Sequence, residues 1–300
     1  MSEIFNVEIT GGIVLKGRKW IAKDAKANLS FITGMEEHAA RYERFGQFLN
    51  ENGVNLFVLD HFGQGLNVED PKDLQKWPKN AFAMTIEAME KERALAASNG
   101  LPTVVGGHSM GSFMTQAYIE TYPNPDQKVI IMGSNGGQAG LMGMAFMISS
   151  MIVHKSNWDR PNKTMHNLGL APYAKAIKDR KTDLDWLSYN EENVKIYAAD
   201  PYCGVMNTGG FWKEFTRGMK EIWKKKNMRR VEPSSHILIV SGQDDPVGQM
   251  GKGVRWLEEA YKKVGVKDVR ANLYPHMRHE ILNEKEHDIV DKDLLAFILK

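Results

Sequence analysis

Short apolar runs alternate with longer amphipathic stretches over most of the chain. Runs rich in aliphatic and β-branched residues predict buried strands at 29–34, 54–61, 103–105, 128–134, 235–242 and 269–274. Apolar residues at helical spacing predict helices at 41–52, 81–99, 113–122, 251–264 and 280–299. Strands alternating with helices are typical of a mostly parallel sheet covered by helices on both faces.

The start of the chain has a different pattern. Residues 5–9 alternate between apolar and polar, and strand-like residues at 13–15 and 19–22 flank Lys16-Gly17. Such alternation predicts two or three antiparallel strands at one edge of the sheet.

One long region breaks the alternation of strands and helices. It contains a methionine-rich stretch, a middle rich in Lys, Arg and Asp, and an aromatic segment with Trp212, Phe215 and Trp223. The region follows the carboxyl end of a strand, which is where ligands bind in open α/β sheets. We therefore predict a core at 1–135 and 231–300, with residues 136–230 inserted as a helical cap over the site.

Composition narrows the class of protein. With 42% hydrophobic residues, 300 residues can bury a large core. The 39 basic and 37 acidic residues leave a formal charge of +2, so the overall charge gives no indication that the protein binds nucleic acid. The single cysteine, Cys203, excludes an intrachain disulfide, and the first residues lack the apolar stretch of a signal peptide. We expect a cytoplasmic protein, whose oligomeric state the sequence does not determine.

A candidate nucleophile lies between the strand at 103–105 and the helix that follows it. Gly107-His-Ser-Met-Gly matches the pattern G-x-S-x-G, in which a sharp strand-to-helix turn exposes the serine, here Ser109. Strand and helix pack so closely at such a turn that a Cβ at either glycine would clash. An ordinary Gly/Ser turn is the alternative interpretation.

A serine nucleophile needs a base and an acid that orients the base. In hydrolases with this turn the chain order is Ser, then Asp or Glu, then His. Asp244 and Asp245 follow the strand before the last, and His276 and His279 follow the last strand. The spacing alone leaves both choices open.

Several motifs together resemble the monoacylglycerol lipase and lysophospholipase branch of the α/β-hydrolase superfamily. They cover nearly the whole chain and read Thr33-Gly-Met-Glu-Glu-His-Ala-Ala-Arg-Tyr, Asp60-His-Phe-Gly-Gln-Gly, Gly107-His-Ser-Met-Gly, Asp185-Trp-Leu-Ser, Asp200-Pro-Tyr-Cys-Gly, Gly242-Gln-Asp-Asp-Pro-Val-Gly and Arg278-His-Glu-Ile-Leu-Asn-Glu. The resemblance implies Asp245 as the acid and His279 as the base. It also implies a small ester substrate with an acyl chain and no cofactor.

Two backbone N–H groups are expected to stabilise the oxyanion. One belongs to Met110, the residue after the candidate nucleophile, at a helix N-terminus. The resemblance assigns the second to Met35. The chain departs from the family at Thr33, where His is usual, and at Gln64, where many relatives also have His.

The methionine-rich stretch at 140–153 is apolar on nearly all of its helical faces. Such a helix is either buried in the core or lies against something apolar, and methionine adapts well to irregular ligands. We predict that Met144, Ile148 and Met151 form the wall of an acyl-binding groove. The same apolar cap suggests transient contact with a membrane surface; a core helix is the alternative.

Two other functions share features of this sequence. A serine aminopeptidase would use the same triad, and the acidic residues Asp183, Asp185, Glu191 and Glu192 could hold a substrate ammonium group. A catalytically inactive binding protein on the same fold is the other alternative. The stretch from His279 to Asn283 begins like the zinc motif H-E-x-x-H but lacks its second histidine, so we predict no metal site.

Overall fold

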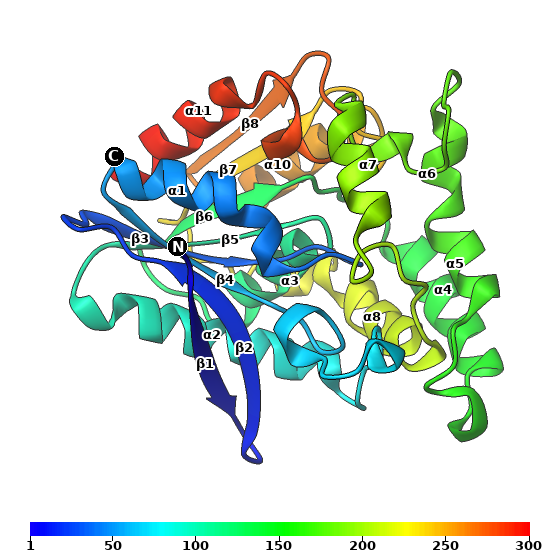
Figure 1. Cartoon of the computed structure of the whole chain (residues 1–300). Coiled ribbons are helices and arrows are strands. Elements are labelled where there is room, and N and C mark those ends of the chain that lie inside the picture. Colours follow the sequence, from blue (N-terminus) through cyan, green and yellow to red (C-terminus); the bar gives the residue numbers. More distant parts are fainter.

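The computed structural model describes residues 1–300 and contains one eight-stranded sheet (Figure 1). The strand order is β1-β2-β4-β3-β5-β6-β7-β8. The strands are β1 Glu3–Ile9, β2 Ile13–Trp20, β3 Ala27–Ile32, β4 Val54–Leu59, β5 Thr103–His108, β6 Lys128–Met132, β7 His236–Gly242 and β8 Asp268–Tyr274. Strands β3 to β8 pair in parallel, whereas β1 and β2 are antiparallel. The predicted mostly parallel sheet is confirmed.

Strand β2 is continuous, so two antiparallel strands are present and the possible third is not. Gly17 lies inside β2, paired with Phe5 on one side and Leu59 on the other. A Cβ at Gly17 would lie 2.3 Å from the carbonyl oxygen of Val58 and 2.6 Å from the Phe5 ring. The glycine therefore permits close packing at this point and does not form a turn.

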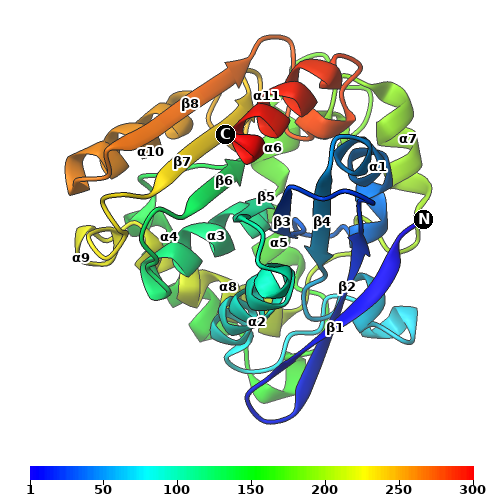
Figure 2. The same ribbon diagram turned by 90° about the vertical axis from the view of Figure 1, so that its left-hand side faces the viewer.

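Helices cover both faces of the sheet, as the alternation of elements predicted. Helices α1 (Glu43–Glu51) and α11 (His287–Leu299) lie on one face (Figure 2). Helices α2 (Ala81–Ala96), α3 (Met110–Thr121) and α10 (Lys252–Val264) belong to the opposite face, and two large apolar clusters fill the two sides. The sheet is thus buried on both faces, which explains the continuous apolar runs of its central strands.

The last helix begins later than the pattern predicted. Helix α11 starts at His287, and residues Ile281–Asn283 form a single 3₁₀ turn instead. The carboxylates of Glu280 and Glu284 accept hydrogen bonds from Arg41 and from the backbone of Tyr189, respectively. These long-range contacts hold residues 280–284 in a conformation that is not α-helical, so the helix begins only after them.

Residues 136–230 contain six helices. They are α4 Ala139–Ile152, α5 Lys163–Gly169, α6 Ala171–Ala176, α7 Glu191–Ala199, α8 Gly209–Ile222 and α9 Lys225–Met228. Helices α4 to α7 lie at the carboxyl ends of the parallel strands (Figure 1). Helix α8 packs on α4 and also reaches the core, where a Cβ at Gly218 would lie 2.3 Å from the Phe82 ring of α2. None of the helices is long and apolar enough to cross a membrane.

Candidate active site

Ser109 occupies a sharp turn between β5 and α3. Its backbone has φ 54° and ψ −119°, and its N–H donates a hydrogen bond to the carbonyl of Met132 at 2.9 Å. A Cβ on Gly107 would lie 2.4 Å from the carbonyl oxygen of Gly111, and a Cβ on Gly111 would lie 2.3 Å from that of Ile32. The predicted close packing of strand and helix is confirmed at Gly107, whereas Gly111 is required by packing against the end of β3. A non-glycine residue held at this backbone angle is a local strain of the kind found at functional sites.

His279 and Asp245 form a buried pair. Their Nδ1 and Oδ2 atoms are 3.0 Å apart, and both side chains are almost inaccessible to solvent. The Asp245 carboxylate also accepts hydrogen bonds from the Val247 N–H at 2.8 Å and the Ser241 hydroxyl at 3.1 Å. Because the carboxylate accepts from Nδ1–H, the Nε2 atom of a neutral His279 carries the free lone pair. That Nε2 has no hydrogen-bond partner within the chain.

The structure distinguishes Asp245 from Asp244 and His279 from His276, which the sequence spacing alone did not. Asp244 is half-buried and accepts a hydrogen bond from the Tyr189 hydroxyl at 3.0 Å. His276 is exposed in the loop after β8. Asp245 and His279 are therefore the members of the two pairs that lie together.

The loop after β3 and the start of α3 carry the two candidate oxyanion donors. Met110 is the first residue of α3, so its N–H has no partner within the helix. No backbone carbonyl accepts a hydrogen bond from the N–H of Met35. Both residues line the same cavity as Ser109. This placement is compatible with the expected oxyanion hole.

Residues from the loop after β4 hold the segment before Met35 in place. The Nε2–H of His61 donates to the Thr33 carbonyl at 2.8 Å, and the Gln64 amide donates to the Gly34 carbonyl at 3.3 Å. Burial lowers the pKa of His61 to about 4, so its imidazole is neutral. The two departures from the family pattern, Thr33 and Gln64, therefore lie in one hydrogen-bonded unit beneath the loop.

A buried charge network that the sequence analysis did not identify connects the two sides of the site. Arg41 bonds both carboxylate oxygens of Glu280, at 2.6 and 2.7 Å, and one oxygen of Glu37 at 3.0 Å. His108 contacts Glu37 through Nδ1 at 3.1 Å and the carbonyl of His279 through Nε2 at 3.2 Å. The network ties the loop of Met35 to the loop of His279.

The network holds its four ionisable side chains in their charged forms. Both partners of His108 are acceptors, so both of its ring nitrogens donate and the imidazole is cationic. Burial alone would lower its pKa, but the hydrogen bond and charge of Glu37 outweigh burial and raise it. Burial would likewise raise the pKa of Glu37, yet His108 and Arg41 hold it well below its usual range. Only the i, i+4 spacing of Glu37 and Arg41 hinted at this arrangement in the sequence.

A cavity of about 540 Å³ opens from Ser109 and His279 toward the cap. Of its 34 lining residues, 20 are hydrophobic. Met144 and Ile148 of α4 line it, but Met151 does not, and Met151 is 70% exposed. Only Ser149 of α4 is buried, so the core-helix alternative is wrong.

Glu36 is a buried acid on the cavity wall that the sequence analysis did not single out. Its backbone lies in the left-handed region at φ 59°, and its carbonyl accepts hydrogen bonds from the Tyr197 hydroxyl and the Gly204 N–H. Its Oε1 accepts from the Asn207 amide at 2.5 Å. Burial raises the pKa of Glu36 to about 8.

We expect Glu36→Gln to stabilise the protein increasingly as the pH rises from about 5 to about 8. In that range an unfolded chain ionises Glu36 while the folded chain keeps its proton, so rising pH favours unfolding of the wild type. The variant has no such proton, and its advantage should reach the order of a few kcal/mol near pH 8. Denaturant unfolding of both proteins across this range measures the difference. A difference that does not change with pH would contradict the prediction.

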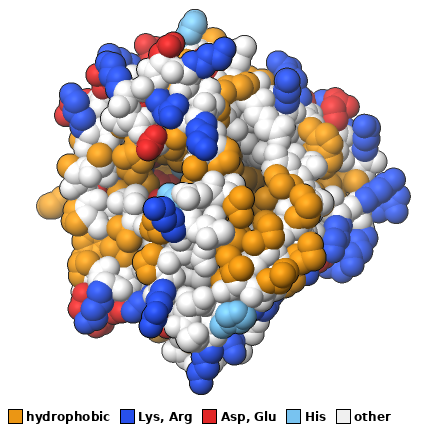
Figure 3. Space-filling model, turned by 90° about the vertical axis from the view of Figure 1, so that its right-hand side faces the viewer, with side chains coloured by type: hydrophobic (Ala, Val, Ile, Leu, Met, Phe, Trp, Pro, Cys, Tyr) orange, Lys and Arg blue, Asp and Glu red, His pale blue; other side chains and the backbone are white.

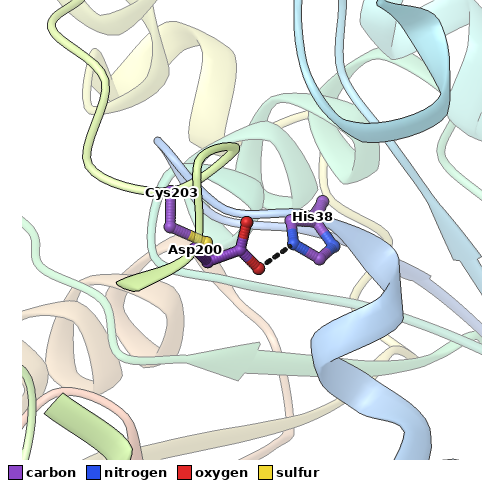
Figure 4. A group of neighbouring side chains, drawn as sticks. All are labelled: His38, Asp200 and Cys203. Carbon is purple, nitrogen blue, oxygen red and sulfur yellow. Dashed lines mark hydrogen bonds and ion pairs between the residues drawn. The ribbon is translucent and has the colours of Figure 1, made fainter. Parts of the chain in front are cut away.

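Two groups of side chains have donor atoms that could hold a metal ion. His38, Asp200 and Cys203 place theirs within 4.8 Å of one another behind the Met35 loop (Figure 4). His38 and Asp200 already pair at 2.8 Å, and burial raises the pKa of the Cys203 thiol well above its usual value. A protonated thiol is a poor metal ligand. The second group is His287, Asp288 and Asp291, on α11.

The acidic residues that could have held a substrate ammonium group lie outside the cavity. Asp183 pairs with Arg180 at 3.4 Å, and Glu191 pairs with Lys181. Neither they nor Asp185 and Glu192 line the cavity. The acids that do line it are Glu36, Glu37 and Glu280.

The sheet order, the turn at Ser109 and the inserted helices define an α/β-hydrolase, as expected. The model of the family described as "Serine aminopeptidase, S33" matches residues 23–286, so the chain belongs to this family of α/β-hydrolases.

Curated relatives and solved structures agree with this assignment. A monoacylglycerol lipase of Mycolicibacterium smegmatis is 24% identical over 292 residues, which cover 96% of this chain and 94% of the relative. A thermostable carboxyl esterase from Bacillus coagulans, solved in complex with glycerol, superposes with a TM-score of 0.90 at 22% identity, covering 100% of this chain and 99% of the esterase. A monoglyceride lipase from Saccharomyces cerevisiae, solved with a substrate analogue, superposes with a TM-score of 0.71 at 16% identity, covering 99% and 94% of the two chains.

Proposed function

We propose that this protein is a serine hydrolase that cleaves carboxylic esters of lipid-like monoacyl substrates, such as a monoacylglycerol or a lysophospholipid. The observation that carries the proposal is the large apolar cavity that opens from Ser109 and the His279–Asp245 pair. An apolar cavity with few polar groups suits an acyl chain that ends in a single reactive ester.

The proposed reaction proceeds through an acyl-enzyme. Nε2 of His279 takes the proton of Ser109 as Oγ attacks the ester carbonyl carbon, and Asp245 orients and stabilises the imidazolium. The N–H groups of Met35 and Met110 stabilise the negative charge on the carbonyl oxygen. His279 then protonates the departing alcohol. Water, activated by the same imidazole, finally releases the fatty acid and restores Ser109.

The similar proteins support an ester substrate. Relatives along nearly the whole chain include the monoacylglycerol lipase and a phospholipase of Bacillus subtilis that is 20% identical. Aminopeptidase action is supported less well, because the acids at 183, 185, 191 and 192 lie away from the cavity. An inactive binding protein would have no use for the strained turn at Ser109 or for a buried His–Asp pair.

The exposed face of the cap also suits a lipid-like substrate. Figure 3 shows hydrophobic side chains gathered around a hollow, with most Lys and Arg side chains toward the edges of the view and a few beside the hollow. The most exposed large apolar residues of α4 and α5 are Leu141, Met144, Met147, Ile148, Met151 and Leu168. Contiguous exposed apolar residues mark interaction surfaces. We propose that this face touches aggregated lipid or a membrane surface while the substrate enters.

A panel of dissolved substrates tests the function. We expect the protein to hydrolyse p-nitrophenyl esters, with kcat/KM rising by up to about fourfold per CH₂ until the cavity is filled. Aminoacyl p-nitroanilides should be poor substrates. Faster cleavage of the anilides than of every ester would contradict the proposal, and failure to cleave either, together with no labelling of Ser109 by a fluorophosphonate, would favour a binding protein.

We expect Met144→Asp combined with Ile148→Asp to abolish the rise with chain length while short esters are still cleaved. Both side chains line the cavity, so a charge there removes the gain from burying CH₂ groups. The matched control is Met147→Asp with Met151→Asp on the same helix, because neither of these side chains lines the cavity. The control should keep the rise on dissolved esters but act more slowly on lipid vesicles. Equal losses of both double variants on dissolved esters would rule out a specific acyl groove.

A further inference from the structure

Glu36 lines the cavity, but the ester hydrolysis described above gives it no role. Its left-handed backbone is held by the Tyr197 hydroxyl of α7 at 2.9 Å and by the Gly204 N–H, from the segment after α7, at 3.1 Å. A strained residue persists only where its surroundings fix it, and such residues cluster at functional sites. Glu36 also directly follows Met35, the candidate oxyanion donor. The side chain of Glu36 is therefore attached to the residue next to the N–H that would bind the oxygen of the reacting ester carbonyl.

The neighbouring charges balance without Glu36. Glu37 and Glu280 are two negative charges, and Arg41 and His108 are two positive charges in hydrogen-bonding contact with them. Glu36 forms no close ion pair, since the nearest basic atom is Nδ1 of His166 at 3.9 Å. Burial lowers the pKa of His166, which favours its neutral form. Glu36 is thus an acid without a cationic partner on a largely apolar cavity wall.

The hydrogen-bonding capacity around Glu36 is only partly used. Oε1 accepts from the Asn207 amide at 2.5 Å, whereas Oε2 accepts no hydrogen bond from the chain. The buried Nδ1 of His166 and Oδ1 of Asn207 also lack partners, although neither residue lines the cavity. Polar groups inside proteins normally have hydrogen-bond partners, so Oε2 of Glu36 on the cavity wall is free to bind a polar group of a ligand.

We propose that Glu36 determines specificity by binding a hydroxyl group on the alcohol part of the ester. This inference rests on the proposed ester hydrolase function and refines its substrate class. The atoms next to the carbonyl on the acyl side are CH₂ groups, so a hydroxyl close to the reacting carbonyl belongs to the alcohol side. A glycerol-like alcohol carries hydroxyls a few bonds from the ester carbonyl, whereas a simple alkyl alcohol carries none.

A substrate ammonium group is a weaker match for Glu36. The adjacent charges sum to zero, and burial keeps the carboxyl in its neutral form near pH 7. A neutral carboxyl can both donate to and accept from a hydroxyl. Moving a cation onto this apolar wall would instead require ionising Glu36 and desolvating both charges.

The test compares two esters with the same acyl chain, 1-decanoylglycerol and propyl decanoate, which differ only in the two hydroxyls. We expect wild type to prefer the glyceryl ester in kcat/KM. Glu36→Leu should reduce this preference about 5- to 50-fold, because the hydroxyl loses its partner. Glu36→Gln, a neutral polar residue of the same shape, should keep it within about threefold. A general disturbance of the Met35 loop would lower kcat/KM for both esters, so it would not change the ratio of the two kcat/KM values.

The outcomes separate this inference from the function on which it rests. If wild type cleaves neither ester, the proposed function fails. If it cleaves both equally, or if Glu36→Leu keeps the full preference, the esterase stands and the role of Glu36 is overturned. Where a variant does not fold, equal cleavage of the two esters by wild type still overturns the inference. A second substrate pair, the p-nitrophenyl esters of norleucine and hexanoic acid, tests the ammonium alternative, and a preference for norleucine that Glu36→Leu removes would also overturn the inference.

Discussion

Ser109→Ala is expected to lower kcat on every ester substrate by about 10⁴ to 10⁶, because a nucleophile and its base act as a unit. The backbone turn and the cavity should remain, since the hydroxyl of Ser109 contributes no hydrogen bond to the fold. Single-turnover and steady-state rates with a p-nitrophenyl ester measure the loss.

An exposed serine provides the matched control for this experiment. Ser98 lies in the 3₁₀ turn that follows α2, and its hydroxyl donates only to the Leu95 carbonyl. Ser98→Ala should keep full activity and full labelling by a fluorophosphonate, while Ser109→Ala should not be labelled. Substantial ester hydrolysis by pure Ser109→Ala would mean that the reaction uses another nucleophile.

The second large effect is expected for Asp245→Asn, which should lower kcat by about 10³ to 10⁴. An asparagine amide can donate to Nδ1 of His279, and this would leave the proton on Nε2, where it blocks removal of the Ser109 proton. Asp245 also accepts from the Val247 N–H and the Ser241 hydroxyl, so thermal unfolding must be measured alongside activity.

The neighbouring aspartate is the control for Asp245. Asp244→Asn alters only a hydrogen bond with the Tyr189 hydroxyl, and we expect a change in kcat of less than about threefold. The assignment of the acid is wrong if Asp244→Asn proves the more damaging of the two. Equal, small effects of both substitutions would indicate that His279 is oriented by another group.

The sequence by itself determined the order and type of most elements. Buried strands have continuous apolar runs and helices have apolar residues every three or four positions, and both patterns are local. The turn at Ser109 was also predictable, because the G-x-S-x-G pattern is local, although the contact that requires Gly111 is with Ile32 of the distant strand β3. The run of helices between β6 and β7 was recognisable as an interruption of the alternation between strand and helix.

The tertiary structure alone decided which side chains meet. Asp244 and Asp245 differ by one position in sequence, yet only Asp245 contacts His279, because the backbone path after β7 sends the two side chains in different directions. Arg41 and Glu280 are separated by 239 positions, so no local pattern could reveal their contact.

Residues of α4 and of the Met35 loop also show that the tertiary structure decides which side chains line the cavity or are buried. Every face of α4 is apolar, so periodicity could not tell that Met144 lines the cavity and Met151 lies outside it. Glu36 appeared in the sequence as one acid of a Glu-Glu pair. Its burial depends on Asn207, Tyr197 and Gly204, which approach from a distant segment of the cap region. Side-chain burial and pairing depend on contacts between segments far apart in sequence, and these exist only once the chain has folded.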